Sequence, residues 1–115
     1  MEVKRINENG VSLLSLHGRF DAAAAPDAES VFKDFINENP DRVVVDLADV
    51  EYISSGGLRV IIMLAKSIEK SGGALRLCAL SPFVSEVFEL TNLGKRYVLC
   101  DSREEAVASL SGGDS

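Results

Sequence analysis

The sequence is poor in the residues that metal sites, disulfide frameworks and catalytic triads require. Its 115 residues include two cysteines and one histidine. Cys78 and Cys100 each lie inside an apolar segment rather than in a spaced framework, which predicts buried free thiols in a reducing compartment. His17 has no cysteine, serine or second histidine at a recognisable triad spacing, so we interpret it as a structural edge residue. We therefore expect no metal, no cofactor, no disulfide and no enzymatic activity.

Positive charge and long apolar runs are also scarce. The chain has 12 Lys and Arg residues against 18 Asp and Glu, a formal net charge of -6, and no run of Lys or Arg exceeds two residues. Without a basic surface, DNA and RNA are poor partners. No apolar run approaches the roughly 20 residues of a membrane span, and the N-terminus lacks the apolar region of a signal peptide. These absences predict a cytoplasmic protein that binds neither nucleic acid nor membranes, with a monomer as the default.

What the sequence does contain is enough apolar surface for one compact domain. Hydrophobic residues make up 46% of the chain, and a chain of this length buries roughly two thirds of the surface that it exposes when unfolded. Strand-like segments alternate with segments of helical period, with no internal repeat and no low-complexity linker. That alternation predicts an α/β fold with a mostly parallel sheet.

The predicted elements follow the order β-β-α-β-α-β-α-β-α. The Asn9-Gly10 pair favours a tight hairpin turn between the first two strands, and the β-branched run 42–47 indicates a central strand covered on both faces. Ser81 and Ser102 are the predicted N-caps of the last two helices, and residues 111–115 should form a flexible tail. Strands are expected at 2–6, 11–16, 42–47, 74–80 and 97–100, and helices at 27–37, 57–71, 82–93 and 103–110.

Two loops are the candidates for function, because loops that follow parallel strands gather at the carboxyl edge of the sheet. One loop spans His17–Asp21 and the other spans Glu51–Leu58. If their strands run parallel, Asp21 comes close to Ser55. In the second loop Ser-Ser-Gly-Gly stands before a helix, where free N–H groups and the helix dipole favour an anion such as a phosphate on Ser55. The pattern is neither a Walker phosphate loop nor a nucleophile elbow.

Each of these features also has a purely structural interpretation. Ser54 or Ser55 would serve as an ordinary N-cap, with the two glycines relieving backbone crowding. Asp21 would form an Asx turn or cap the next helix. Three further apolar residues of the 57–71 helix form either a docking surface or a face covered by neighbouring helices. They are Val60, Met63 and Leu64.

Four sequence motifs carry a resemblance to a known family. They are Gly18-Arg19-Phe20-Asp21, Val43-Val44-Val45-Asp46-Leu47, Tyr52-Ile53-Ser54-Ser55-Gly56-Gly57-Leu58, and Gly72-Gly73 with Leu75. Together they resemble the anti-sigma factor antagonist family of STAS domains over residues 1 to about 110. The resemblance implies one STAS domain at 1–110, an α/β fold with a single mixed, mostly parallel five-stranded sheet, a β-hairpin at the start and about four helices.

The resemblance also implies a phosphorylation site. Aligned through Leu58, the serine that is phosphorylated in the family falls on Ser55. The sequence departs from the family motif at Ser54, where the family has an acidic residue, and at Gly56, where it has Ser or Thr. Asp21 corresponds to an aspartate that would help to position the kinase's nucleotide or a cationic side chain near the serine.

The implied function is a non-enzymatic binding switch that is controlled by phosphorylation. The protein would sequester an anti-sigma factor serine kinase while Ser55 is unphosphorylated, and a serine phosphatase would be its second partner. The implied partner-binding residues are Asp21, Ser54, Ser55, Gly56, Gly57, Leu58 and Arg59.

Two alternatives stay open at this point. The same fold would suit an interaction subunit of a transporter or signalling assembly in which Ser55 is never phosphorylated. The other alternative is a response-regulator receiver with Asp46 as aspartyl phosphoacceptor; otherwise Asp46, inside a buried strand pattern, is expected to hydrogen-bond a neighbouring loop. The opening hairpin argues against a receiver, which should begin strand-helix and carry a paired acidic Mg²⁺ site.

Overall fold

The chain begins with a β-hairpin, as the Asn9-Gly10 pair predicts. Strand β1 (Glu2–Glu8) pairs antiparallel with β2 (Val11–His17). Asn9 and Gly10 connect the strands with φ angles of 53° and 79°, positive at both positions as a type I′ turn requires. Both strands run further than the sequence predicts.

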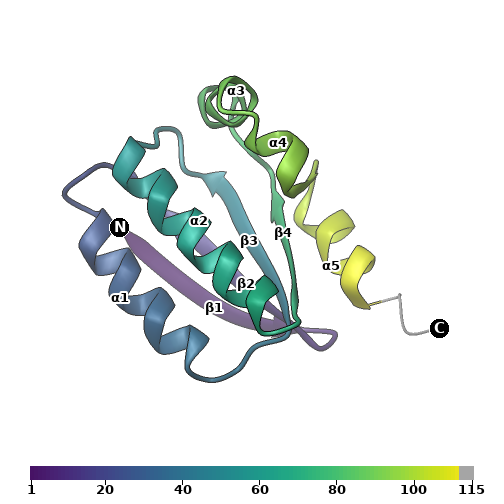
Figure 1. Cartoon of the computed structure of the whole chain (residues 1–115). Coiled ribbons are helices and arrows are strands. Elements are labelled where there is room, and N and C mark those ends of the chain that lie inside the picture. The colour runs from purple at the N-terminus through teal and green to yellow at the C-terminus, as the bar shows by residue number, and fades with distance from the viewer. Residues whose placement is uncertain (112–115) are drawn as a thin grey trace.

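One five-stranded sheet organises the whole chain (Figure 1). The structure, a computed structural model, describes residues 1–111; residues 112–115 of the predicted tail lie outside the described residues, and Ser111 belongs to the last helix. The elements after the hairpin are α1 (Ala25–Ile36), β3 (Arg42–Asp49), α2 (Ser55–Lys70), β4 (Ala74–Cys78), α3 (Pro82–Leu90), α4 (Leu93–Arg96), β5 (Val98–Cys100) and α5 (Arg103–Ser111). The strand order is β1-β2-β3-β4-β5, and every pair after the first is parallel. The predicted mixed, mostly parallel sheet is therefore confirmed.

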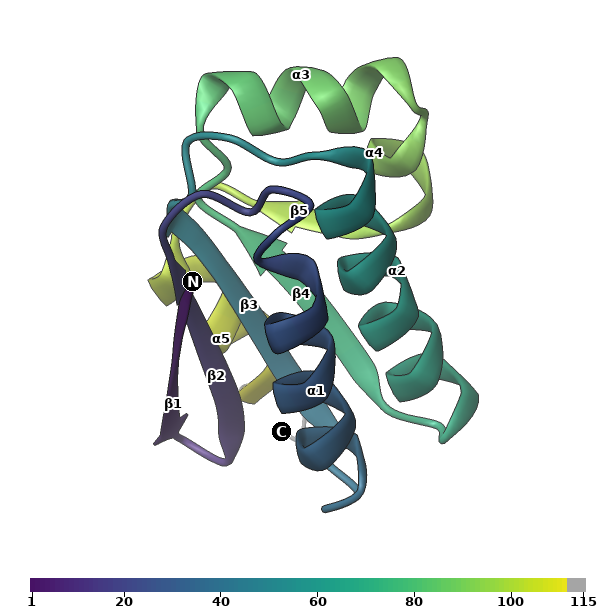
Figure 2. The ribbon, with the colours of Figure 1, turned by 90° about the vertical axis from the view of Figure 1, so that its left-hand side faces the viewer.

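Helices cover both faces of this sheet (Figure 1, Figure 2). Helices α1 and α2 pack side by side on one face, α5 covers the other, and α3 lies across the carboxyl edge. Side chains of β3 alternate between two cores, because Val43, Val45 and Leu47 pack in the core beneath α1 and α2, whereas Val44 packs with α5. This burial on both faces confirms β3 as the central strand. None of the helices in the described part of the chain is long and apolar enough to cross a membrane.

An ion pair between a half-buried arginine and a buried aspartate fastens α5 to the sheet. Asp46 of β3 is 5% exposed. Its Oδ2 accepts a hydrogen bond from Nε of Arg103 at 2.9 Å and lies 2.8 Å from Nη2 of the same guanidinium. Its Oδ1 accepts the Ala48 N–H at 2.9 Å. Asp46 therefore bonds its own strand and α5 rather than the neighbouring loop that the sequence predicts. Because both oxygens are occupied and the side chain is enclosed, Asp46 is not placed to be a phosphoacceptor, and the receiver alternative is wrong.

Positive φ angles shorten two of the predicted elements. The strand expected at 74–80 ends earlier because Ala79 has a φ of 59°. The helix expected at 82–93 ends at Leu90, and Asn92 follows with a φ of 62°. The chain then resumes as the short helix α4, which the sequence did not predict.

The two predicted serine caps have different outcomes. Ser102 Oγ accepts the Glu105 N–H at 3.1 Å, so the cap of α5 is confirmed. Ser81 occupies the N-cap position of α3, but it makes no side-chain cap and its Oγ donates to the Val50 carbonyl at 2.9 Å. Ser81 therefore ties α3 to the segment that follows β3.

Both cysteines are buried free thiols, as predicted. They lie opposite each other in the register of β4 and β5. Burial raises the pKa of Cys78 to about 12 and also raises the pKa of Cys100. Since the thiolate is the nucleophilic form, Cys78 is unreactive at neutral pH.

Candidate functional site

The two candidate loops lie side by side at the carboxyl edge of the sheet (Figure 2). A parallel bridge joins Phe20 of the first loop to Ile53 of the second. The Phe20 N–H donates to the Tyr52 carbonyl at 3.0 Å, and the Phe20 carbonyl accepts the Ser54 N–H at 2.8 Å. The predicted meeting of the loops is confirmed, with Phe20 as the residue of contact.

Ser54 is the N-cap of α2. Its Oγ accepts the Gly57 N–H at 3.1 Å and donates to the Phe20 carbonyl at 3.1 Å. One hydroxyl therefore satisfies an orphan donor of the helix and also fastens the helix start to the neighbouring loop. The structural interpretation of the serine pair thus applies to Ser54.

Ser55 differs from Ser54 in every respect that matters for chemistry. It is the first residue of α2 and is exposed, and its hydroxyl bonds no other residue within 1–111. The first turn of α2 holds no acidic residue, so an anion there would meet the positive end of the helix dipole without competition. The Ser55 hydroxyl is the one of the pair that is free to react.

The two glycines of the motif have separate roles. A Cβ on Gly57 would lie 2.6 Å from both Cδ1 and the carbonyl oxygen of Phe20, closer than atoms can approach. A Cβ on Gly56 would meet nothing nearer than 3.7 Å. Only Gly57 is required for close packing, and because it is buried, any part that it plays in partner binding is indirect.

Asp21 shapes the entry to α1. Its Oδ1 accepts the Ala24 N–H at 2.9 Å, and its carbonyl accepts the N–H groups of Ala24 and Ala25. The structural interpretation of Asp21 is therefore correct for this oxygen. Oδ2 lies 3.9 Å from Nε of Arg19, at a side chain that is 39% exposed, so one carboxylate oxygen is left for an external group.

An aromatic stack on this edge was missed by the sequence analysis. The Arg19 guanidinium lies 4.3 Å from the centroid of the Tyr52 ring, which stacks on Phe83 at 5.4 Å and 23°. Arg19 and Tyr52 lie in the two candidate loops, and Phe83 lies in the first turn of α3. Because the three residues are far apart in the sequence, no local pattern predicts their contact. Phe83 is 46% exposed, and the stack gives the site an apolar border on the side of α3.

His17 also has partners that the sequence analysis missed. Its Nδ1 lies 2.7 Å from Oδ2 of Asp49, and its Nε2 lies 2.9 Å from Oγ of Ser15. The contacts run serine, histidine, aspartate, as in a catalytic triad. The sequence analysis found no triad spacing around His17 and did not predict this arrangement. Ser15 is only 4% exposed and its Oγ lies 3.5 Å from Nη2 of Arg103, so no substrate reaches it. The arrangement is structural, as interpreted for His17.

A groove separates the first turns of α1 and α2, next to Ser55. Val60 and Leu64 are buried in the core, and Met63 is partly exposed on the groove wall. Of the three apolar residues that were candidates for a docking surface, only Met63 is therefore partly exposed. The groove has a volume of about 330 Å³, and it is lined by Ala22, Ala25, Pro26, Glu29, Gly56, Arg59, Val60 and Met63.

Comparison with known proteins gives a consistent result. The sequence model of the STAS domain matches residues 2–106. BtrV of Bordetella bronchiseptica, provisionally named an anti-sigma factor antagonist, is 37% identical over 101 residues, which cover 88% of this chain and 87% of BtrV. The anti-sigma-F factor antagonist RsfB of Mycobacterium tuberculosis is 29% identical over 109 residues, covering 93% and 87%. The crystal structure of an anti-sigma factor antagonist from Mycobacterium paratuberculosis matches with a TM-score of 0.87 and 26% identity, covering 95% and 92%.

The geometry of the glycine pair predicts opposite effects of the same substitution. Gly57→Ala should lower the free energy of unfolding by about 1–3 kcal/mol, because the added methyl group overpacks against Phe20. Gly56→Ala is the matched control, and it should be neutral or stabilising by at most about 1 kcal/mol, since alanine is the better helix former. Urea unfolding of both variants measures the difference. Equal stabilities would contradict the close contact between Gly57 and Phe20.

Proposed function

The chain belongs to the STAS domain family, and from this premise we propose that it is an anti-sigma factor antagonist. In the unphosphorylated state it binds and sequesters an anti-sigma factor that is a serine kinase, so that the sigma factor is released. Phosphorylation of Ser55 ends this binding, and a serine phosphatase restores it. The observation that carries the proposal is the exposed Ser55 hydroxyl, which makes no hydrogen bond within residues 1–111 and begins α2 beside a serine already used as the cap.

The proposed reaction fits the chemistry of this position. The kinase transfers the γ-phosphoryl group of ATP to Ser55 Oγ, ADP leaves, and the hydroxyl proton passes to a base of the kinase. The product phosphate lies at the N-terminus of α2, where N–H groups and the helix dipole stabilise negative charge. The N-cap hydrogen bond of Ser54 does not involve the Ser55 hydroxyl, so α2 keeps its start in both states.

Local charge is sufficient to switch the binding. A phosphate adds about -1.5 to -2 charges at neutral pH. A loss of roughly 3 kcal/mol of binding free energy already lowers affinity by more than about 100-fold. Ser55 lies on the surface at the start of a helix, so neither binding nor release needs the fold to change.

The remaining proposed binding residues contribute to different degrees. Ser55 and Arg59 are exposed, Gly56 and Leu58 are partly exposed, and Gly57 lies beneath Phe20. Ser54 acts through its cap. We assign to Asp21 the positioning of the kinase's nucleotide or of a cationic side chain, through the Oδ2 that Ala24 does not occupy.

The first test concerns the phosphoacceptor. Incubation with the cognate kinase and ATP should label Ser55 in the wild-type protein, and Ser55→Ala should abolish the label. Ser54→Ala should retain it, although the loss of the cap lowers the free energy of unfolding by about 1 kcal/mol. Phosphopeptide mapping locates the phosphate label in both variants. Label that persists in Ser55→Ala and disappears in Ser54→Ala would assign the site to Ser54.

The second test concerns the switch itself. Affinity for the anti-sigma factor should fall in the order wild type, Ser55→Asp, phosphorylated protein, because aspartate brings one negative charge and lacks the three acceptor oxygens of phosphate. Ser55→Asp should stay folded, since a carboxylate at a helix N-terminus is favourable by about 0.3–1 kcal/mol. Calorimetric titration gives the three affinities. Equal binding of all three would leave a constitutive STAS interaction module as the function.

The third test separates the two oxygens of Asp21. Asp21→Asn keeps an acceptor for the Ala24 N–H and should change the free energy of unfolding by less than about 0.5 kcal/mol, whereas Asp21→Ala should cost about 1 kcal/mol. Both variants lose the charge, so both should be phosphorylated about tenfold more slowly, the loss expected for a charged hydrogen bond. Thermal melts and kinase assays give the two quantities. Wild-type phosphorylation of Asp21→Asn would make the role of Asp21 purely structural.

A further inference from the structure

The outer edge of the sheet is a strand whose backbone is paired on one side. β1 is the first strand in the order β1-β2-β3-β4-β5, so within residues 1–111 it pairs with β2 alone. Figure 2 shows that no described helix lies beside its free edge. β1 spans seven residues, whereas β5 at the other edge spans three. Such an edge presents free N–H and C=O groups to any strand that approaches it.

The hairpin determines which backbone groups of β1 point outward. Glu8 and Val11 flank the two-residue turn, and residues in these positions form a hydrogen-bonded pair. Such pairs recur at every second residue of an antiparallel ladder. The N–H and C=O groups of Val3, Arg5 and Asn7 therefore point away from β2 and can bond an added strand.

One face of this edge carries opposite charges on either side of an exposed isoleucine. Arg5 lies over the Phe35 ring of α1, so Lys4, Ile6 and Glu8 lie on the other face of the strand. Ile6 is 41% exposed. In the described part of the chain Lys4 and Glu8 form no ion pair. A cation, an apolar side chain and an anion thus follow one another at equal spacing.

We infer that β1 pairs antiparallel with β1 of a second copy of this chain, with Ile6 facing Ile6 across a two-fold axis. In this register Lys4 of each copy faces Glu8 of the other, and the backbones of Arg5 and Asn7 exchange hydrogen bonds. The edge is self-complementary, as an interface between identical copies requires, and opposite charges across paired strands stabilise the pairing. The two sheets become one continuous sheet. The inference concerns assembly and does not depend on the proposed function.

Charge disfavours the other registers. Pairing centred on Arg5 would set Arg5 against Arg5 and Glu2 against Glu8, and pairing centred on Lys4 would set two lysines against each other. Pairing centred on Asn7 would set the isoleucine against a carboxylate. A shift by a single residue would oppose outward-pointing N–H groups to residues that already bond β2.

The charges on β1 act as a filter for the partner strand. Charged side chains on an edge strand commonly block pairing with other chains. Here they block strands that bring the same order of charges and admit a strand that brings the reverse order. β1 of a second copy, running antiparallel, is such a strand.

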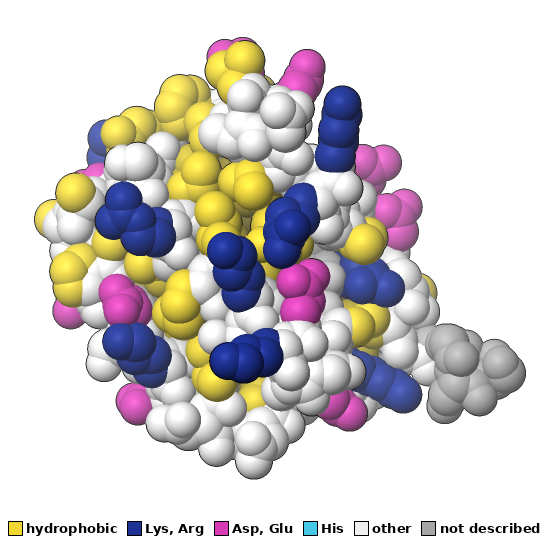
Figure 3. Space-filling model, in the orientation of Figure 1, with side chains coloured by type: hydrophobic (Ala, Val, Ile, Leu, Met, Phe, Trp, Pro, Cys, Tyr) yellow, Lys and Arg dark blue, Asp and Glu magenta, His cyan; other side chains and the backbone are white. Residues whose placement is uncertain are grey.

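The overall charge of the chain does not prevent this contact. Each copy has a net charge of -6, but repulsion between exposed charges is largely screened beyond about 8 Å at physiological ionic strength. On the face that carries α1 and α2, acidic and basic side chains are interspersed (Figure 3). This face therefore presents no extended surface of one sign to a second copy.

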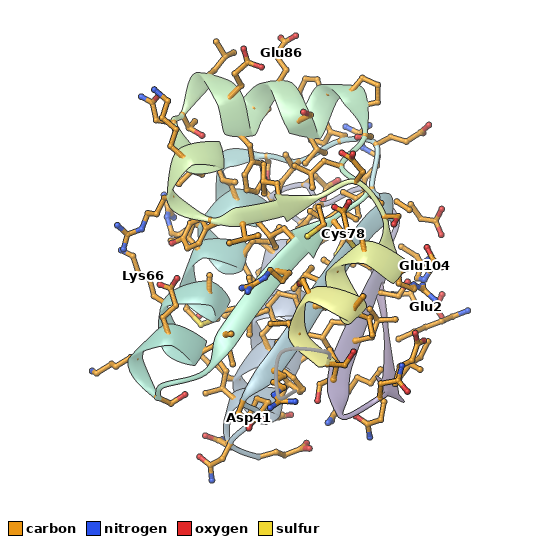
Figure 4. The ribbon with its side chains drawn as sticks, turned by 90° about the vertical axis from the view of Figure 1, so that its right-hand side faces the viewer. Glu2, Asp41, Lys66, Cys78, Glu86 and Glu104 are labelled. Carbon is orange, nitrogen blue, oxygen red and sulfur yellow. The ribbon has the colours of Figure 1, made fainter. Side chains whose placement is uncertain are left out.

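The pairing leaves the candidate site open. Met1 lies at the carboxyl edge of the sheet, where its Cα would be 3.6 Å from a Cβ on Gly18. Ile6 is five residues further along the strand, roughly 17 Å away. Figure 4 shows Glu2 of β1 and Lys66 of α2 on opposite sides of the molecule. A dimer through β1 therefore presents two copies of the Ser55 site, both accessible.

The association is weak because the interface is small. One segment of each copy, residues 4–8, is paired, which is well below the roughly 1,200 Å² of buried surface in stable complexes. The chain is then a monomer at low concentration, the state expected from the sequence, and a dimer at high concentration.

Charge reversal at two positions tests the register. Sedimentation equilibrium of the full chain, from about 10 µM to about 1 mM, should show a monomer–dimer equilibrium. Lys4→Glu and Glu8→Lys each set like charges opposite each other, and each should weaken self-association by about tenfold. An equimolar mixture of the two variants should form a heterodimer about as tightly as the wild type dimerises, since both charge pairs are then restored. Glu2→Lys, the matched control outside the paired segment, should change self-association by less than about twofold.

Two outcomes of this experiment would overturn the inference. One is a wild-type chain that stays monomeric at about 1 mM. The other is a mixture that associates no better than its components, because loss of the charge pairs is then not the cause of the weakening. Recovered association in the mixture also shows that both variants are folded.

Cross-linking tests the position of the two-fold axis. Ile6→Cys places two thiols opposite each other at a non-hydrogen-bonded pair, where Cα atoms lie about 4.5 Å apart, within the range of a disulfide. Oxidised glutathione should convert this variant into a covalent dimer. Lys4→Cys is the control and should not cross-link, because the two residues at position 4 are offset by roughly 14 Å along the strands. The native Cys78 and Cys100 are buried. Equal cross-linking of the two variants would overturn the proposed register.

Discussion

The candidate site depends on one point of contact, between Phe20 and the start of α2. The Phe20 carbonyl accepts both the N–H and the hydroxyl of Ser54, and the Phe20 ring lies where a side chain on Gly57 would be. Because these bonds fix the N-cap, they also fix the direction in which α2 begins and the exposure of the next residue, Ser55. Phe20 itself is fully buried, so the functional edge is held by the hydrophobic core and its geometry does not depend on flexible surface groups.

The opposite face of the sheet supports the same edge through a chain of polar contacts. Arg103 bonds Asp46 and lies 3.5 Å from Ser15, and His17 links Ser15 to Asp49. The Asp49 carbonyl accepts the N–H of Gly18, the first residue of the first candidate loop after the end of β2. The Asp46 side chain is 7% exposed and that of Arg103 is 34% exposed, so loss of Arg103 would leave an uncompensated buried carboxylate. The pair therefore specifies where α5 sits, and through His17 that placement extends to the start of the loop.

The sequence predicts the parts of this structure that depend on local patterns. Alternation of strand and helix periods predicts the sheet and most helices, and the Asn9-Gly10 pair predicts the hairpin. It does not predict the positive φ of Ala79, because alanine has no preference for this conformation and tertiary packing imposes it. Asn92 also adopts positive φ, which asparagine tolerates, but the sequence does not show that the helix ends there. Arg103 and Asp46 are 57 positions apart in the sequence, and no local sequence pattern predicts a contact between residues so far apart. The candidate site follows the same rule: the motif predicts that one of the two serines is an N-cap, and only the structure shows that it is Ser54.

Separate roles for two adjacent serines would allow the proposed phosphorylation of Ser55 without a change of fold. If the capping hydroxyl were also the phosphoacceptor, the phosphate would compete with the Gly57 N–H for the same oxygen, and the helix start would differ between the two states. Ser54 makes the cap, so charge added at Ser55 would change the surface and leave the backbone in place. An acidic residue precedes the acceptor in the family motif and would lie next to the added phosphate. With Ser54 in its place, the first turn of α2 holds no acidic residue, and Arg59 is the charged neighbour one turn away on the same face.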